Sequence, residues 1–296
     1  MKNLFFPLLA GAGLICFSPT DVCAQQQEFK QHISKEFSLQ KSTGGVLALY
    51  NLNGSLDVEG YSGDKVLIEV DERLRADDSA SLEIGKKEFK LAFDTIADTI
   101  IVYIAEPFDT RPCRNCDRWE RRGRYGDRDE IPYDFDLVFK VKVPYHMNLD
   151  ISTVNKGDIT VESVSGGLHV NNVNGKITIK DAKGDTWAHT INGDLTVNYL
   201  DAPSGNSEWY TLNGKLSVTF PASLSADLQF KSWNGSFYTD FPKWEVLPVR
   251  VTKNVKKRGA GTEYQLIIDK QIRIGEGGKL FKFETMNGNI YIKRQA

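Results

Sequence analysis

The chain has 296 residues, of which 41% are hydrophobic and 26% are charged, and its formal net charge is -2. These fractions are ordinary for folded globular proteins and exclude a largely disordered chain. A charge so near zero also argues against a surface that binds nucleic acid throughout, so we expect no nucleic-acid partner. The length suffices for one large β domain.

The N-terminal segment has the features of an export signal. An apolar run at residues 4–17 is followed by the small-residue cleavage site Val22-Cys23-Ala24, which predicts a signal peptide over residues 1–24. The bulky residues Ile15 and Val22 before the two cysteines disfavour lipid attachment. We therefore expect an exported mature chain in the periplasm, on the outer-membrane surface or in the medium. We expect no transmembrane segment in it, because no later apolar run approaches the length of a membrane-spanning helix.

Residues 25–35 are polar and predict a loose N-terminal arm, followed by a single domain over residues 36–296. Apolar alternation predicts strands at residues 46–50, 66–70 and 133–143 and a β-hairpin from residues 89–93 and 99–105. Between them, Asp78 or Ser79 is suited to cap one short helix within residues 76–90.

A loop insertion at about residues 107–132 interrupts the strand pattern. Cys113 and Cys116 form a CxxC there; in an oxidising compartment we favour a local disulfide over free thiols or a metal site, because the chain has no second CxxC and no histidine lies near. The same loop is rich in arginine and acidic residues. It predicts either an anion or glycan contact surface or a mobile loop whose charges pair internally. The candidate contact residues are Arg114, Arg118, Trp119, Arg121, Arg122 and Tyr125.

A short motif recurs through the second half of the chain: a hydroxyl residue, an apolar residue, Asn, Gly, a polar residue and an apolar residue. Asn174, Asn192, Asn213 and Asn234 follow one another at steps of 18, 21 and 21 residues. A fixed period of this size predicts an all-β, single-stranded, right-handed β-helix or β-solenoid with repeats of ~18–21 residues. The predicted structural turn ladder comprises Asn53, Gly54, Asn174, Gly175, Asn192, Gly193, Asn213, Gly214, Asn234, Gly235, Asn287 and Gly288.

Glycines at positions 157, 166, 175, 184 and 193 recur every nine residues, so each repeat holds two turns and two short strands. The inward residues then form apolar pairs, and His169 beside them points outward. These pairs are Ile159/Val161, Leu168/Val170, Ile177/Ile179, Leu195/Val197 and Leu216/Val218.

Three columns follow from stacking the motifs. We expect the Asn side chains to hydrogen-bond at one corner and the glycines to supply positive φ there. The hydroxyl column comprises Thr153, Thr190, Thr211, Ser232 and Thr285. The apolar column comprises Val154, Val173, Ile191, Leu212, Trp233 and Met286, and its growth in size predicts a core that widens along the axis.

This repeat, following an exported N-terminus and the strand Phe139-Lys140-Val141-Lys142-Val143-Pro144, resembles the bacterial putative-adhesin family over about residues 39–293. The resemblance implies a β-helix-like fold in the cell envelope. The family is a domain of unknown function and brings no catalytic residues. The chain departs from its pattern at Lys156, which splits the first Asn-Gly, and in the Arg/Cys loop.

The motifs of common catalytic sites do not occur in this sequence, so we expect no catalytic residues, no metal site and no cofactor. The leading interpretation is a monomeric, non-enzymatic envelope or surface protein that binds an envelope protein or a polysaccharide. The alternatives are a polysaccharide lyase or hydrolase on a β-helix scaffold, and a structural or regulatory module without a ligand. Residues 243–296 hold 12 basic against 5 acidic residues, which indicates either a solvated face or a polyanion-binding one.

Overall fold

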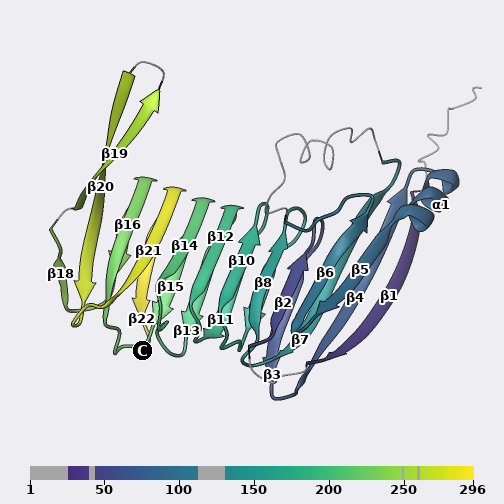
Figure 1. The fold of residues 1–296 in the computed structure, drawn as a ribbon, viewed down its shortest axis with the longest axis horizontal. Coiled ribbons are helices and arrows are strands. Elements are labelled where there is room, and N and C mark those ends of the chain that lie inside the picture. The colour runs from purple at the N-terminus through teal and green to yellow at the C-terminus, as the bar shows by residue number, and fades with distance from the viewer. Residues whose placement is uncertain (1–25, 40–43, 113–130, 249, 259–260) are drawn as a thin grey trace, which may run out of the picture.

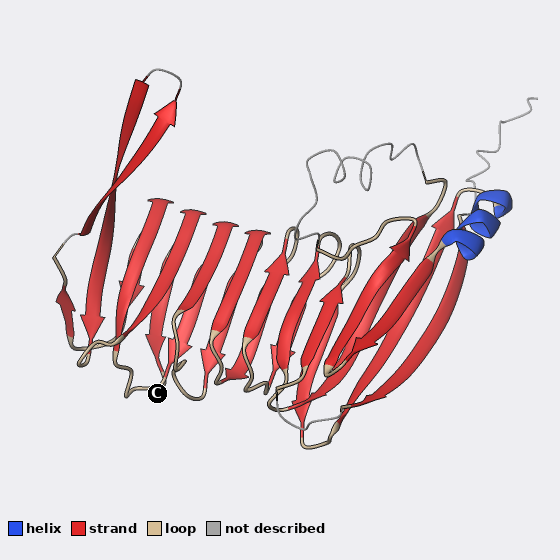
Figure 2. Cartoon of the chain, viewed as in Figure 1, coloured by secondary structure: helices blue, strands red, loops and turns tan. Residues whose placement is uncertain are grey.

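The computed structural model describes residues 26–39, 44–112, 131–248, 250–258 and 261–296. Over these ranges the fold is all-β, with 22 strands and one helix. The strands form two large mixed sheets of ten and twelve strands (Figures 1 and 2). Inward side chains of both sheets belong to a single buried cluster that extends from Leu47 to Ile292 in sequence.

The segment expected as a loose arm is instead mostly strand. β1 (Gln27–Ser38) pairs antiparallel with β4 along its whole length, from Gln27 opposite Ala76 to Ser38 opposite Lys65. Phe29, Ile33 and Phe37 recur every four residues, so they share one face of the strand, and that face packs against the core. The polar residues between them misled the prediction, because an edge strand exposes its other face to water.

The other N-terminal elements agree with the predicted ones. The helix begins after Asp78, whose Oδ1 accepts a hydrogen bond from Ser81 N at 2.8 Å, and the predicted hairpin forms from β5 and β6. The helix lies at the end of the molecule beside β1 and β4 (Figure 1). The bounds are β2 (Val46–Tyr50), β3 (Leu56–Tyr61), β4 (Lys65–Ala76), α1 (Ser79–Glu88), β5 (Lys90–Ile96), β6 (Thr99–Glu106) and β7 (Asp134–Pro144).

In the repeating part, consecutive strands alternate between the two sheets. Even-numbered strands belong to the twelve-stranded sheet and odd-numbered strands to the ten-stranded sheet, and neighbours from successive repeats pair in parallel. The predicted inward pairs are confirmed: each is buried, with at most 3% of its surface exposed. The bounds are β8 (Asn148–Thr153), β9 (Ile159–Glu162), β10 (Leu168–Asn172), β11 (Ile177–Ala182), β12 (Thr186–Asn192), β13 (Leu195–Tyr199), β14 (Ser207–Asn213), β15 (Leu216–Phe220), β16 (Ala226–Asn234) and β17 (Phe237–Thr239).

At the C-terminal end, spatial order departs from sequence order. The last strand pair inserts between earlier repeats: β21 pairs with both β14 and β16, and β22 pairs with both β15 and β17. The hairpin of β19 and β20 extends beyond the two layers (Figures 1 and 2). The bounds are β18 (Trp244–Val246), β19 (Arg250–Arg258), β20 (Gly261–Ile274), β21 (Lys279–Asn287) and β22 (Ile290–Arg294).

The motif asparagines form a continuous hydrogen-bonded row, here called the Asn ladder. Each Nδ2 donates to the Oδ1 of the asparagine in the neighbouring repeat. The row begins at Asn53, whose own Nδ2 donates to Phe135 O at 3.2 Å. In spatial order the donors are Asn155 (3.3 Å), Asn174 (3.0 Å), Asn192 (2.8 Å), Asn213 (2.9 Å), Asn287 (2.7 Å) and Asn234 (2.8 Å).

The motif glycines are needed for close approach rather than for positive φ. Among the ladder glycines only Gly54 has a left-handed φ, of +110°. A Cβ on Gly193 would lie 2.1 Å from Gly175 O, and a Cβ on Gly214 would lie 2.1 Å from Gly193 O. The expected reason for glycine was therefore wrong: stacked corners bring backbone against backbone, and a side chain would separate them.

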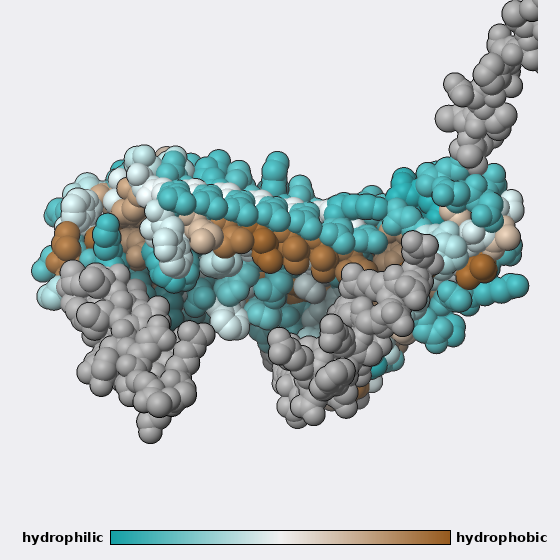
Figure 3. All heavy atoms as spheres, turned by 90° about the horizontal axis from the view of Figure 1, so that it is seen from above, coloured by the Kyte–Doolittle hydropathy of each residue, from teal (hydrophilic) through white to brown (hydrophobic). Residues whose placement is uncertain are grey.

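The expected orientation of the apolar column was also wrong. Hydroxyl residues point inward: Thr190 Oγ1 donates to Gly175 O at 2.9 Å and Thr211 Oγ1 to Gly193 O at 2.8 Å, and both threonines are buried. The apolar residues point outward instead. Trp233 is 60% exposed and Ile191 39%. Figure 3, which looks onto this edge, shows an apolar band beside a hydrophilic row.

We expect Gly193→Ala to lower the free energy of unfolding by about 3 kcal/mol, because its Cβ would overlap a carbonyl that the stacked corner cannot move freely. Gly44→Ala is the control. Gly44 has a φ of +88°, and no atom lies within 4 Å of the position that a Cβ would take there, so only backbone strain of ~1 kcal/mol applies. Urea unfolding of both variants measures the difference, and equal losses would contradict the close-approach argument.

Asn192→Ala should lower the free energy of unfolding by ~1 kcal/mol, because it removes two neutral hydrogen bonds at a solvent-exposed corner. Asn198→Ala, on the outward face of β13 and outside the ladder, is the matched control and should change stability by less than about 0.5 kcal/mol. Chemical denaturation checks both values. A loss at Asn192 no larger than at Asn198 would show that the ladder does not stabilise the fold.

Candidate functional site

The outward face of the twelve-stranded sheet carries aligned rows of side chains. In a strand every second residue points to the same face, and the parallel registers place Asp150 beside His169, His169 beside Trp187, Trp187 beside Glu208, and Glu208 beside Lys282. Five adjacent strands thus contribute one residue each to this row.

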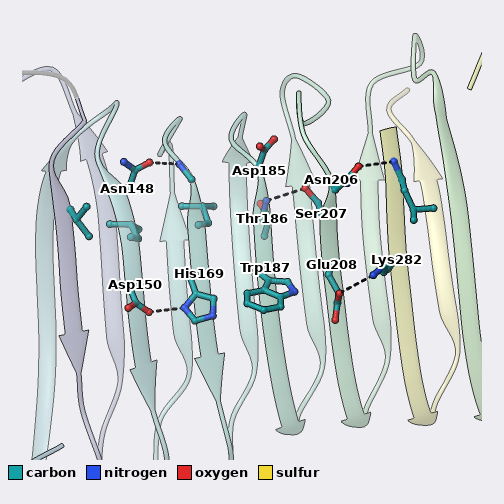
Figure 4. A pocket seen from close by; sticks show the side chains of 15 residues that line it. Asn148, Asp150, His169, Asp185, Thr186, Trp187, Asn206, Ser207, Glu208 and Lys282 are labelled. Atoms are coloured by element: carbon teal, nitrogen blue, oxygen red, sulfur yellow. Dashed lines mark hydrogen bonds and ion pairs between the residues drawn. The ribbon is translucent and has the colours of Figure 1, made fainter. Parts of the chain in front are cut away.

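The row crosses an open groove with a volume of about 730 Å³. Figure 4 shows its polar and aromatic side chains above β8, β10, β12, β14 and β21. We call this feature the sheet groove. Its polar and aromatic lining residues include Asn148, Asp150, His169, Asp185, Trp187, Asn206, Glu208 and Lys282.

Hydrogen bonds and ion pairs fix the carboxylates at both ends of the row. Asp150 Oδ2 accepts from the Tyr50 hydroxyl at 2.6 Å, and Asp150 Oδ1 lies 2.6 Å from His169 Nδ1. At the other end Glu208 lies 3.8 Å from Lys282 Nζ. Because these residues hold one another in place, the groove presents oriented charges rather than freely rotating ones.

Trp187 is the aromatic centre of the groove. Its side chain lies on a short strand between smaller residues, and 49% of its surface is exposed. Its ring centroid is 5.2 Å from that of His169 and 5.3 Å from that of His189. These contacts steady an indole that still offers an apolar surface to the groove.

Two asparagine amides supply hydrogen-bond donors at the groove rim. Asn148 Oδ1 accepts from Gly167 N at 2.8 Å, and Asn206 Oδ1 accepts from Leu280 N at 3.1 Å. Because the oxygens are held by the backbone, the NH2 groups are left as donors. The groove therefore combines acceptors, donors and one flat apolar surface.

His189 lies in the next row along the same face, 3.5 Å from Glu208. Burial lowers the pKa of His189 below its ordinary value of 6.5, and His169 adds to this, whereas Glu208 and Glu284 act in the opposite direction. The histidine is thus disposed to remain neutral in the folded protein.

The sequence-predicted contact residues are not among those that the structure describes. Arg114, Arg118, Trp119, Arg121, Arg122 and Tyr125, like Cys113 and Cys116, lie outside the described residues, as does the expected signal peptide. The Asn ladder lies at the end of the strands, separate from the groove residues.

Sequence reasoning missed Asp150, Trp187, Glu208 and Lys282, although a signal was present. Each stands five residues before a motif asparagine, as His169 also does. Repeats aligned on their asparagines therefore predict one row across the sheet. The residues of the row share a position within the motif but differ in type, so the sequence did not mark them as a site.

Within the described residues, no cluster of three or more histidine, cysteine or acidic side chains has a geometry that suits a metal ion. In the same part of the chain, no helix is long and apolar enough to cross a membrane.

No protein-family model and no curated protein sequence matches the chain. Solved structures that are similar to it include the following two. A putative cell adhesion protein from Clostridium sporogenes is 9% identical, with a TM-score of 0.43 over 90% of this chain and 100% of that one. A putative adhesin from Bacteroides fragilis is 10% identical, with a TM-score of 0.32 over 90% of this chain and 97% of that one. The family resemblance seen in the sequence stays a prediction.

We expect His189 to make stability depend on pH. Because its pKa is lower in the folded state, the unfolded chain binds more protons as the pH falls through 6.5, so stability falls with it until the pH passes the folded pKa. His189→Gln removes this pH-dependent contribution to the free energy of unfolding. Urea unfolding at pH 8, 7, 6 and 5 should show the wild type losing stability relative to the variant below pH 6.5. A difference that stays constant over this range would contradict the assignment.

Proposed function

We propose that the chain is a non-enzymatic β-solenoid of the cell envelope or surface that binds a polysaccharide through the outward face of its twelve-stranded sheet. The solenoid interpretation is supported by successive repeats that pair in parallel and by the uninterrupted Asn ladder. Export through residues 1–24 and the bacterial adhesin-like role belong to the same proposal.

The observation that carries the binding function is the half-exposed indole of Trp187 within the sheet groove. A pyranose ring has an apolar C–H face and a rim of hydroxyl groups. An exposed indole suits the first, and fixed carboxylates and amides suit the second. Glu208 lies beside Trp187 in the row, Asp150 lies on the other side beyond His169, and Asn148 lies above Asp150 (Figure 4).

The alternative is an enzyme that cleaves such a polymer. Glycoside cleavage uses a pair of carboxyl groups across the scissile bond, one of which donates a proton. In the sheet groove Asp150 is engaged by Tyr50 and His169, and Glu208 is near the ammonium of Lys282. These contacts orient the two carboxylates as hydrogen-bond and ion-pair acceptors, which suits binding better than proton transfer.

Trp187→Ala should weaken binding of a soluble polysaccharide by about tenfold, which corresponds to ~1.4 kcal/mol, because it removes the stacking surface. Trp244→Ala is a matched control, since Trp244 is 54% exposed and lies outside the groove on β18, and it should leave affinity unchanged. Calorimetric titration against neutral, amine-bearing and acidic glycans measures both.

Two results would overturn the proposal. One is that wild-type protein binds none of the glycans in the panel. The other is that Trp187→Ala and Trp244→Ala have the same affinity as the wild type. Release of shortened saccharides during incubation, detected by chromatography, would favour the enzymatic alternative.

A further inference from the structure

We propose that the sheet groove selects a polysaccharide that carries free amino groups, such as a glucosamine polymer, and rejects uronate polymers. This inference rests on the proposed function, because it names the ligand class of the same site. It is argued from the charges of the groove, their position around Trp187, and its hydrogen-bonding groups.

The polar lining is acidic in balance. Asp150, Asp185 and Glu208 contribute three carboxylates, against the single ammonium of Lys282, so the groove has an excess of two negative charges when its histidine is neutral. The chain as a whole is only -2, so the groove is a local concentration of negative charge. Such a concentration attracts cations and repels anions near the surface.

The carboxylates lie in the same groove as the aromatic surface. Glu208 is the register neighbour of Trp187 on β14. Asp185 lines the groove directly before the first residue of β12, and its Oδ1 accepts a hydrogen bond from Gly205 N at 2.6 Å. On the other side of Trp187, Asp150 lies two strands away on β8, with His169 of β10 between them. A sugar stacked on the indole would hold an ammonium group attached to its ring near the carboxylates and near the π face of the indole. Carboxylates and aromatic π faces each attract a cation.

The neutral groups of the groove suit a polymer that carries hydroxyl groups. The amide nitrogens of Asn148 and Asn206 are donors, and such donors can bind hydroxyl oxygens. A polymer lying across the strands also meets a repeat of ~4.8 Å, close to the length of one sugar unit. The row of Asp150, His169, Trp187, Glu208 and Lys282 follows this direction.

The test titrates the full chain, at pH 7, with hexasaccharides of glucosamine, N-acetylglucosamine and galacturonic acid. We expect glucosamine to bind about tenfold more tightly than N-acetylglucosamine, and galacturonic acid to bind most weakly. The preference should decrease as salt is raised, because the charges are partly solvent-exposed.

Variants that replace a carboxylate with the near-isosteric neutral amide show which carboxylates produce the preference for glucosamine. Glu208→Gln and Asp185→Asn should each lower the affinity for glucosamine several-fold and leave that for N-acetylglucosamine within twofold. Glu162→Gln is the control: it removes the same charge from the outward face of the ten-stranded sheet, where Glu162 pairs with Lys180 at 3.2 Å, and should change neither affinity. Unfolding curves of each variant verify that it folds.

The outcomes separate the two proposals. Equal affinity for glucosamine and N-acetylglucosamine, or tighter binding of galacturonic acid, would overturn the amino-sugar inference and leave polysaccharide binding standing. Absence of binding to all three, together with the wider glycan panel, would overturn both. Tighter binding of a lysine hexapeptide than of the glucosamine hexasaccharide would overturn the inference in favour of a peptide ligand.

Discussion

The close approach of backbones at the stacked corners is the constraint on which the rest of the molecule depends. Gly175, Gly193 and Gly214 place their Cα atoms against the carbonyl of the preceding repeat, and the Asn ladder and inward hydroxyls satisfy the polar groups of the same corner. Because this contact admits only one spacing, it fixes the register of each strand in the sheet. Register in turn decides which residues of distant repeats become neighbours. The alignment of His169, Trp187 and Glu208 across the groove is therefore a product of glycine packing at another edge.

The repeat was predictable because the sequence spacing of its motif residues and the size of its inward side chains both indicate it. The spacing of Asn174, Asn192 and Asn213 and the inward pairs such as Ile177/Ile179 are evident in the sequence, and the inward pairs are buried as expected. The orientation of the motif was predicted wrongly, because hydropathy was taken to decide which side faces inward. At this corner an inward-facing carbonyl needs a donor, and Thr190 or Thr211 supplies it. Residues such as Ile191 consequently take the outward positions.

The groove was less predictable, for two physical reasons. Its residues share a position within the repeat but differ in type, so no composition signal marks Asp150, Trp187 and Lys282 as one set. In addition, Lys282 reaches the groove only because β21 inserts beside β14. That pairing joins segments whose ladder asparagines are 74 residues apart, and nothing in the period of 18 to 21 residues indicates which repeat will be the neighbour. Tertiary pairing, and not local propensity, completes the site.

The inserted position of β21 and β22 also bears on how the molecule can be made. A stack in sequence order would let each new repeat settle on the one before it as the chain emerges. Here the surface formed by β14 and β15 is covered by β21 and β22 at the very end of the chain, and β16 and β17 dock on that last pair in turn. During synthesis the growing stack therefore stays open after β15 until residues 279–294 have been made. Truncation before residues 279–294 would therefore remove β21 and β22 and also the strands on which β16 and β17 pack.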